Sequence, residues 1–519
     1  MKLRLFAMVV AALPISIHAG EFGPLLTAEN GTFPENACAI HLIHVVGGDF
    51  LFFGRAPISN LKSWTFNAFN GKFSEPIDLG PNVFCCGVSQ LPDGRPIIVG
   101  GDMNGTGSGV TSTFIFDLVD EELDQVGNLS QTRWYPTPAL LADGTLAAIS
   151  GWGDVPEVDW RDRIDVFNAS NGTWADFMPT FHSSVPQSVM QPHFYPFMFA
   201  YYDALAPTAR KLFFAGRATV DDIGEGYTYK TYSLNFTSNG AAEWSLFGGD
   251  SVIPGSGAVM MINGTHPIDA GTIYKFGGQQ GSSVLGLGRK IDLNDGDLEW
   301  VPTASMPELE ERTECNVVAM PDGRIALVGG TTSTSHLSLP STGVNNIIIY
   351  NPATNSYDEI SDDFAGTRMY HSTATPSPTG TIFLAGGDYH VPDPLNPGQF
   401  IAHSNYTAQE YYPTYFTIDA MPATITAAPT RANWNTTIQV TATGPVDHFA
   451  LLKLTSTTHA FDTTQRYIKM TAAATPSGNN YQLYTPKNGG IAPPGYYMLF
   501  AISTYGVPSV AKYIKIGPS

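Results

Sequence analysis

Short apolar runs alternate with polar turns along most of the chain, and one unit of this pattern recurs seven times. Each copy has a turn, an apolar run and a terminal glycine or its equivalent, as in "LPDGRPIIVGG" and "MPDGRIALVGG". A second alternating run with a polar turn follows, as in "RIDVFNASNGTW" and "NIIIYNPATNSY". Period-two alternation bounded by Gly and Asn turns predicts β-hairpins. The copies end at Gly54, Gly100, Ser150, Gly216, Gly277, Gly329 and Gly386, so successive copies lie 46 to 66 residues apart.

This spacing predicts the architecture of the larger part of the chain. Four short strands per roughly 50 residues are typical of a kelch-type propeller blade. Residues 20–416 are therefore predicted to form a seven-bladed kelch-type β-propeller. Unrelated hairpins packed as a sandwich are the alternative, and the regular repeat disfavours it.

After Tyr415 the repeat stops. Short alternating runs such as "TTIQVTATG" and "YYMLFAIST" continue without the Gly-Gly ending. About a hundred residues of this pattern predict an immunoglobulin-like β-sandwich over residues 417–519. The expected fold class is thus all-β, a propeller followed by a C-terminal sandwich.

The first residues and the overall charge limit where the protein acts and on what. Lys2 and Arg4 precede an apolar run that ends in small residues near Ala19, which predicts a cleaved secretory signal over residues 1–19. No later run is long enough for a membrane span, and a net charge of −20 disfavours a nucleic-acid partner. Nine Asn-X-Ser/Thr sequons fit a secreted glycoprotein. They are Asn30, Asn104, Asn128, Asn168, Asn171, Asn235, Asn263, Asn405 and Asn435.

The chain has four cysteines, Cys38, Cys85, Cys86 and Cys315, which are too few for a disulfide scaffold. Cys85 and Cys86 are adjacent, and neighbouring cysteines rarely bridge each other without strain. Each of these two sulfurs therefore needs its own explanation.

The repeat also aligns the chain against itself. Counting back fifteen residues from the ends of the second, third, sixth and seventh copies gives Cys85, Tyr135, Glu314 and His371, with Tyr370 beside the histidine. Each position starts the innermost strand of a predicted blade. Because inner strands run parallel around the axis, these side chains are expected to meet at one mouth of the channel. Glu314 at this mouth could touch a substrate, but we expect it to be a solvated carboxylate at the rim.

A histidine and two tyrosines near a thiol suggest a transition metal. Imidazole nitrogen with phenolate oxygen suits Cu(II) better than zinc, which prefers a tetrahedron of Cys and His. For either tyrosine alone, filling the channel is the simpler explanation.

Four motifs in order resemble the copper radical oxidases, the group of glyoxal oxidase and galactose oxidase. They are "NVFCCGVSQLPDG", "TRWYPTPALLADG", "TRMYHSTATPSPTG" and "TSTTHAFDTTQRYIKM", the last followed by "IAPPGYYMLFAISTYGVPS". The resemblance runs from about Cys85 to the C-terminus and includes both predicted domains. The short N-terminal region and the "RWYPT" and "RMYHS" forms look closer to glyoxal oxidase.

The resemblance implies a role for each matching residue. Cys85 would form a thioether bond to the ring of Tyr135, giving a cofactor that holds a radical and is an equatorial ligand of one copper ion. Tyr370 would be the axial ligand and the base that accepts the substrate proton. His371 and His459 would be the imidazole ligands, with His459 supplied by the C-terminal domain.

Two further positions are less fixed by the resemblance. The family stacks an aromatic ring over the thioether, and Trp152 in "ISGWGD" matches this position best, with Trp160 as the alternative. Cys86 stands where the motif usually has a small or imino residue, and strand alternation turns it away from the channel. It is predicted to be a structural thiol, either buried or paired with Cys38 or Cys315.

The implied function is that of a secreted copper radical oxidase, which oxidises small aldehydes to carboxylic acids and reduces O2 to H2O2. A primary-alcohol or galactose-type oxidase would have the same ligands. A catalytically silent kelch protein that binds glycans or acts in adhesion is the alternative from another class. We expect a monomer, with peroxidases as partners that use the H2O2.

Overall fold

The computed structural model describes residues 20–28, 33–34, 37–55, 61–102, 108–153, 163–182, 194–204, 210–217, 231–237, 241–248, 255–295, 298–396 and 398–518. The predicted signal segment and Asn30, Asn104 and Trp160 lie outside these residues. The regular structure that is described consists of β-strands and two short 3₁₀ helices, η2 (Pro340–Thr342) and η3 (Thr414–Phe416). The all-β prediction is therefore confirmed, and no described helix has the length and apolarity to span a membrane.

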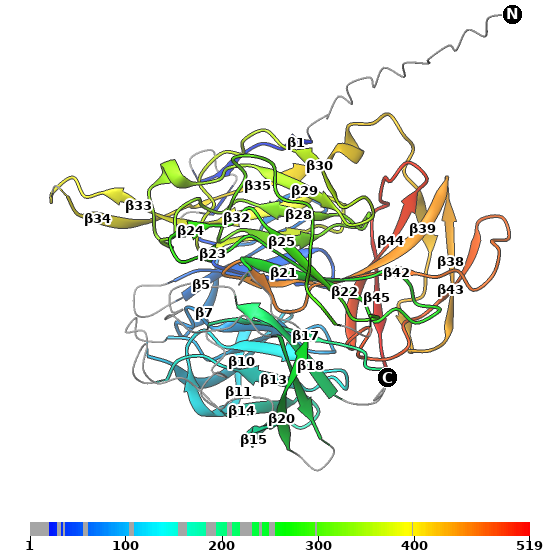
Figure 1. The fold of residues 1–519 in the computed structure, drawn as a ribbon, viewed down its shortest axis with the longest axis horizontal. Helices are drawn as coiled ribbons and strands as arrows, with labels where there is room; N and C mark the ends of the chain where they lie inside the picture. Colours follow the sequence, from blue (N-terminus) through cyan, green and yellow to red (C-terminus); the bar gives the residue numbers. More distant parts are fainter. Residues whose placement is uncertain are drawn as a thin grey trace, which may run out of the picture.

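The repeat region forms seven sheets within the described ranges, and each contains one copy of the sequence unit (Figure 1). The first sheet has β3 (His41–Val45), β4 (Asp49–Phe53), β5 (Leu61–Asn67), β6 (Lys72–Phe73) and β7 (Ile77–Gly80). The second has β8 (Gly87–Gln90), β9 (Pro96–Val99), β10 (Val110–Asp117) and β11 (Glu122–Arg133). The third has β12 (Thr137–Leu140), β13 (Leu146–Ile149), β14 (Ile164–Asn168) and β15 (Thr173–Phe177). The fourth has β16 (Thr180–Phe181), β17 (Pro196–Ala200), β18 (Arg210–Arg217), β19 (Thr231–Phe236) and β20 (Ala242–Gly248).

The remaining sheets repeat this plan, and the N-terminal strands complete the last one. The fifth has β21 (Gly257–Ile262), β22 (Thr272–Phe276), β25 (Gly288–Asp292) and β26 (Val301–Pro302). The sixth has β27 (Asn316–Ala319), β28 (Ile325–Val328), β29 (Ile347–Asn351) and β30 (Ser356–Ile360). The seventh has β31 (Ser372–Pro376), β32 (Ile382–Gly386), β35 (Thr407–Tyr412), β1 (Glu21–Phe22) and β2 (Leu26–Thr27). Two small hairpins are added, β23 (Gln279–Gln280) with β24 (Ser283–Val284) and β33 (Asp388–Pro392) with β34 (Phe400–Ser404).

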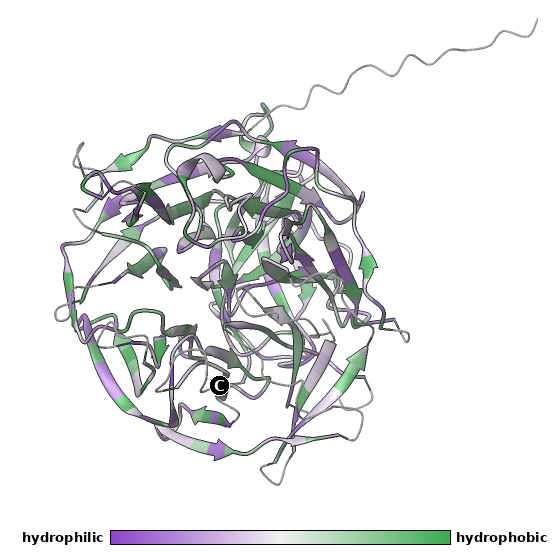
Figure 2. Cartoon of the chain, turned by 60° about the vertical axis from the view of Figure 1, so that its left-hand side comes forward, coloured by the Kyte–Doolittle hydropathy of each residue, from purple (hydrophilic) through white to green (hydrophobic). Residues whose placement is uncertain are grey.

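The first strand of each repeat sheet contacts the first strand of the next one. The neighbours run β3, β8, β12, β17, β21, β27 and β31, and β31 contacts β3 again. Figure 2 shows the sheets arranged around a common centre. The starts of these inner strands are therefore brought together.

The glycines that end repeats allow close approach of the segment that leads into the next inner strand. Gly100 has φ +67°, and a Cβ there would lie 2.4 Å from the carbonyl oxygen of Arg133. Gly329 has φ +65° and is as close to the carbonyl oxygen of Arg368. Only glycine adopts this backbone without steric cost.

Fully buried arginines tie the repeat ends to the strand starts. Arg133, Arg312 and Arg368 are each at most 1% exposed. Each donates to the carbonyl that ends the repeat after it in the chain, Arg133 to Ser150, Arg312 to Gly329 and Arg368 to Gly386. These bonds satisfy buried backbone acceptors directly beside the candidate site.

The C-terminal region adds two layers of strands and joins the repeat region through one sheet. One layer has β36 (Thr424–Ala427), β38 (Thr437–Thr443) and β43 (Asn480–Tyr484). The other has β37 (Arg431–Ala432), β39 (Val446–Lys453), β42 (Arg466–Met470), β44 (Gly495–Ser503) and β45 (Lys512–Ile516). Strand β42 pairs in parallel with β21, so this layer and the fifth repeat sheet form one nine-stranded sheet.

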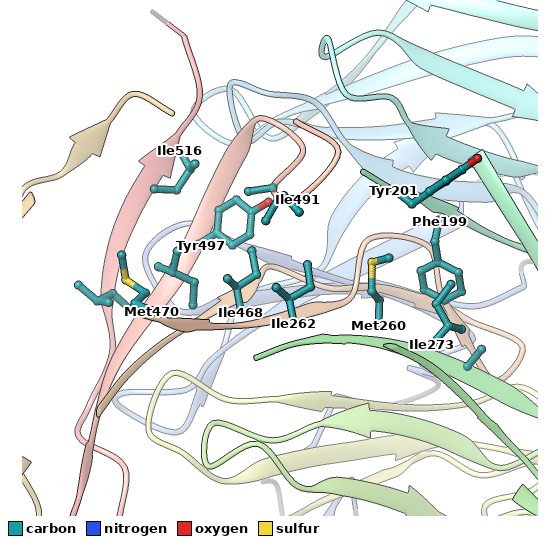
Figure 3. Packing of buried hydrophobic residues seen from close by; sticks show 14 of the residues in the cluster. Phe199, Tyr201, Met260, Ile262, Ile273, Ile468, Met470, Ile491, Tyr497 and Ile516 are labelled. Carbon is teal, nitrogen blue, oxygen red and sulfur yellow. The ribbon is translucent and has the colours of Figure 1, made fainter. Parts of the chain in front are cut away.

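The core is also continuous across this junction. Met260 and Ile262 of β21 belong to the same buried cluster as Ile468 of β42 and Tyr497 of β44 (Figure 3). Burying such apolar side chains stabilises the junction by about 25 cal/mol per Å² removed from water. The two regions are therefore packed together.

One hairpin leaves the C-terminal region and enters the repeat region. Strand β40 (Ser456–Thr458) pairs with β3 and with β41 (Phe461–Asp462), which gives the first sheet the order β41-β40-β3-β4-β5-β6. The hairpin tip therefore lies at the innermost strand of the first sheet.

Candidate metal centre

Five side chains at the starts of inner strands share an unusual backbone conformation. Cys85, Tyr135, Tyr195, Glu314 and His371 have φ values of 55°, 62°, 40°, 56° and 64°. A non-glycine residue in this region costs about 1–3 kcal/mol, and such residues concentrate at functional sites. Counting back fifteen residues from the repeat ends predicted all of these positions except Tyr195.

Tyr195 is the member that the sequence did not reveal. It directly precedes β17, but it lies 21 residues before Gly216 instead of fifteen, because the fourth copy is longer. Its hydroxyl donates to the carbonyl of Cys86 at 2.9 Å. Its ring lies 5.0 Å from that of Tyr135.

Backbone hydrogen bonds connect these strand starts directly. The amide of Tyr135 donates to the carbonyl of Cys85 at 3.1 Å, and the amide of Tyr195 donates to the carbonyl of Tyr135 at 3.1 Å. The amide of Cys85 donates to Nε2 of His41 at 3.2 Å. The positions of Cys85 and Tyr135 are thus fixed by the main chain.

The two predicted tyrosine ligands face each other. The hydroxyl oxygens of Tyr135 and Tyr370 lie 2.8 Å apart. Burial, followed by the nearby Cys85 thiol, raises the pKa of both phenols well above the usual value. Without a bound cation both are therefore neutral, and a metal ion at this position would favour the phenolate forms.

His371 presents one ring nitrogen to the same region. Its Nδ1 bonds to a carboxylate oxygen of Asp388 at 2.7 Å, which leaves Nε2 pointing toward Cys85. Arg55 also pairs with Asp388 at 2.5 Å. Burial would raise the pKa of Asp388, but His371 and Arg55 lower it overall, so Asp388 is a carboxylate that orients the imidazole.

His459 reaches the site from the C-terminal hairpin. His459 and Ala460 have φ values of 50° and 64° and form the two-residue turn between β40 and β41. The Thr458 hydroxyl donates to the carbonyl of Ile40 at 3.0 Å, so it accepts from Nδ1 of His459 at 2.6 Å. Nε2 of His459 is then the nitrogen that faces the site.

The imidazoles and the thiol converge. Sγ of Cys85 lies 3.5 Å from Nε2 of His459 and 4.0 Å from Nε2 of His371, and the three ligand atoms lie within 4.8 Å of one another. Burial lowers the pKa of both histidines, so both rings are neutral and their Nε2 atoms are free of a proton and able to bind a metal. Burial raises the pKa of the Cys85 thiol, so a free thiolate is disfavoured there.

These residues fit a copper ion. The donor set is two neutral imidazole nitrogens and two phenol oxygens, which is a mixed N,O set typical of tetragonal Cu(II). Both histidines are oriented by a second hydrogen bond, to Asp388 or to Thr458. The Cys85 thiol lies beside the Tyr135 side chain, so it is also near enough to bond to the ring.

Several aromatic rings surround Tyr135. Trp134 lies 4.4 Å from its ring and Phe194 4.8 Å, measured between centroids. Trp152 is 6.5 Å away in an edge-on arrangement and packs on Phe194 at 4.1 Å. Trp152 thus belongs to the cluster, but Trp134 is nearer, and its place next to Tyr135 in "TRWYPT" could have indicated it.

The expectation for Glu314 is wrong. Its side chain is 1% exposed instead of solvated, because the strand start turns it inward. It bonds to Nδ1 of His336 at 2.8 Å, and the His336 ring lies 5.0 Å from that of Tyr370. His336 lies in the loop between β28 and β29, so the count from the repeat ends, which locates only the starts of inner strands, could not predict it.

All four cysteines are buried and free, so neither alternative disulfide of Cys86, to Cys38 or to Cys315, is formed. Cys86 packs in an apolar cluster with Ile43 and Val88, away from Cys85. The prediction that its side chain turns away from the site and is buried is confirmed.

Comparison with known proteins gives related chains and a related fold. A family model for the galactose oxidase-like, early set domain matches residues 421–516. The chain is 26% identical over 471 residues to the aldehyde oxidase GLOX of Vitis pseudoreticulata, across 85% of this chain and 83% of that one. It is 25% identical over 461 residues to a galactose oxidase of Gibberella zeae, across 84% of this chain and 61% of that one. A solved structure of a fungal alcohol oxidase of the AA5 family, in complex with copper, matches with a TM-score of 0.76 and 22% identity over 96% of this chain and 100% of that chain.

Proposed function

The chain belongs to the copper radical oxidase family, and from this premise we propose that it is a secreted enzyme that oxidises small aldehydes to carboxylic acids. It reduces O2 to H2O2 in the same cycle. The observation that carries the proposal is the convergence of four rings: the Tyr135 and Tyr370 hydroxyls lie 2.8 Å apart, and the imidazoles of His371 and His459 pack against these tyrosines. Relatives named aldehyde oxidase and galactose oxidase support the class of reaction.

The proposal also includes the fold of the two regions. We infer that the seven repeat sheets are blades of a kelch-type propeller over residues 20–416, because their first strands are neighbours in a closed series. Residues 417–519 would form the immunoglobulin-like domain that supplies His459. The N-terminal segment with Lys2 and Arg4 supports secretion.

Bound copper, held by His371, His459, Tyr135 and Tyr370, would supply a one-electron redox centre and a Lewis acid. The Cys85 sulfur, bonded to the Tyr135 ring, would lower the oxidation potential of the phenol and spread the spin. The main-chain bond between Cys85 and Tyr135 supports this pairing because it holds the two strand starts together.

Tyr370 would accept the substrate proton. Its hydroxyl is 2.8 Å from that of Tyr135, and its side chain is only half-buried, so it faces the approach from solvent. The oxidised Tyr135 oxygen would take the hydrogen atom from the adjacent carbon. Two electrons and two protons leave the substrate in total, and O2 accepts them to give H2O2.

Aromatic rings around Tyr135 would protect the radical. Trp134, Trp152, Phe194 and Tyr195 enclose it, and Trp152 would be the shielding residue that the family resemblance implies. Exclusion of water limits reduction of the radical by solvent species.

The ligand set is the same in alcohol-oxidising relatives, so a primary-alcohol or galactose-type oxidase is the second candidate. The similarity of this chain to the solved fungal alcohol oxidase supports this second candidate. We expect a monomer that acts on a small molecule and O2, with peroxidases using the H2O2.

The test loads the purified protein with copper, oxidises it and measures H2O2 release in a coupled peroxidase assay. Methylglyoxal, benzyl alcohol and galactose separate the substrate classes. Tyr370→Phe should abolish release, while Tyr505→Phe, a change at a 60% exposed ring outside the site, should leave it intact. Absence of H2O2 from every substrate would favour the silent kelch protein.

A further inference from the structure

Glu314 is a buried carboxylate that the reaction described above does not use. It occupies the same strand-start position and left-handed backbone as Cys85, Tyr135 and His371. One carboxylate oxygen, Oε1, bonds to His336. The other, Oε2, is buried and has no hydrogen-bond partner in the structure.

An unpartnered buried carboxylate oxygen is costly, so a ligand that donates a hydrogen bond is the simplest way to satisfy it. A carboxylate only accepts hydrogen bonds, so the ligand group must be a donor. Glu314 bonds to His336, whose ring lies 5.0 Å from that of Tyr370. The donor would therefore sit near the residue that accepts the substrate proton.

His336 orders the carboxylate and lines the approach to it. Its ring lies at 31° to the ring of Tyr370, and its side chain is 18% exposed, whereas Glu314 beneath it is 1% exposed. The partly exposed His336 ring thus connects the buried carboxylate to the surroundings of Tyr370.

We propose that Glu314, positioned by His336, is a specificity residue that selects substrates with a second hydroxyl group next to the one whose proton Tyr370 accepts. This inference rests on the proposed oxidase function. The matching chemistry is a gem-diol, which is a hydrated aldehyde, or a 1,2-diol. In both, one hydroxyl meets Tyr370 and the other donates to Oε2 of Glu314.

The test compares two alcohols of nearly equal size, ethane-1,2-diol and 1-propanol, which differ by a hydroxyl in place of a methyl group. The wild-type enzyme should favour the diol in kcat/KM by about 10- to 100-fold, as expected for a hydrogen bond to a charged group. Glu314→Gln, which keeps the shape but removes the charge, should reduce the ratio to within about threefold. Glu308→Gln, at an exposed carboxylate on the same segment, is the matched control and should keep the wild-type ratio.

Methylglyoxal, supplied as its hydrate, distinguishes the two substrate types that could provide the second hydroxyl, gem-diols and 1,2-diols. A loss confined to methylglyoxal in Glu314→Gln assigns the site to gem-diols, and a loss confined to ethane-1,2-diol assigns it to 1,2-diols. 2-Aminoethanol tests the donor, because a charged ammonium group also pairs with a carboxylate. A preference for 2-aminoethanol over the diol would overturn the assignment to a hydroxyl.

His336→Gln is the second variant, since an amide can still donate to Glu314. It should lower the diol preference about threefold to tenfold while the thermal unfolding temperature stays near that of the wild type. An unchanged ratio in both variants would overturn the proposal.

A binding measurement separates this proposal from the proposed function. Saturation-transfer NMR on the metal-free protein should give a stronger signal for ethane-1,2-diol than for 1-propanol, and Glu314→Gln should remove the difference. If no substrate is oxidised but this difference is found, the oxidase function fails and the recognition site stands. If substrates are oxidised and the difference is absent, the recognition site fails and the oxidase function stands.

Discussion

The amide of Tyr135 donates a 3.1 Å hydrogen bond to the carbonyl oxygen of Cys85. This bond connects the innermost strands of two neighbouring sheets at the residues that carry the sulfur and the phenol. Both residues have positive φ, so both side chains are turned from the ordinary strand direction toward the same centre. The proposed thioether therefore joins two groups whose main chains are already fixed.

Cross-linking of Cys85 gives the first prediction. Copper-loaded protein kept in air should lose two hydrogens in intact mass, and its denatured, reduced form should migrate faster on a gel, because the thioether survives reduction. Cys85→Ser should erase both effects. Cys86→Ser should keep them, since Cys86 packs in a separate apolar cluster; loss of the cross-link there would place the thioether at the wrong sulfur.

Thr458 sets the orientation of His459, which gives the second prediction. Thr458→Val removes the acceptor of the His459 Nδ1 proton and should weaken copper binding about tenfold, as found for residues that orient metal ligands. Thr457→Val is the control, because the buried Thr457 hydroxyl has no partner in the structure. Competitive titration against a chelator measures the affinity. Equal losses in the two variants would show that packing, and not the hydrogen bond, matters.

The third prediction separates the aromatic residues near Tyr135. Trp134 lies 4.4 Å from the Tyr135 ring and Trp152 lies 6.5 Å from it. Trp134→Phe should therefore shorten the lifetime of the radical more than Trp152→Phe does. Decay of the radical signal after oxidation, followed by optical absorption, measures this. The reverse order would assign the shielding role to Trp152.

Lys453 gives a prediction for stability. Burial lowers the pKa of this lysine to about 7, from an ordinary value of 10.5. Below pH 7 the folded and unfolded states both carry the charge, and the folded state bears the full cost of burying it. As the pH rises from 7 toward 10.5 the folded state loses its proton first, so the cost decreases and stability increases.

Lys453→Met removes this cost. The variant should be more stable than the wild type at pH 6, and its advantage in the free energy of unfolding should shrink by about 2–3 kcal/mol at pH 9. Urea denaturation at the two pH values measures it. Lys512→Met, at an exposed lysine, should show no such change. An advantage of Lys453→Met that is independent of pH would mean that the buried lysine stays protonated over this range, with a pKa near the ordinary value in the folded state.

The sequence by itself determined the all-β fold class and most of the candidate site. The repeat ending in glycine has a local cause, since the left-handed backbone and the close approach of the segment that leads into the next inner strand exclude a Cβ at Gly100 and Gly329. Because this geometry recurs, a fixed count along the chain located Cys85, Tyr135, Glu314 and His371. His459 came from resemblance alone, because the hairpin that carries it has no counterpart in the repeat.

Tertiary structure decided the remaining features, since they depend on contacts between segments far apart in the chain. Tyr195 escaped the count because the fourth copy is longer, and only its bonds to Tyr135 and Cys86 place it in the site. The burial of Glu314 depends on His336, which comes from a loop without periodic pattern. Periodicity reports the local backbone and the face of a strand, whereas burial and pairing are set by whichever distant segment packs there.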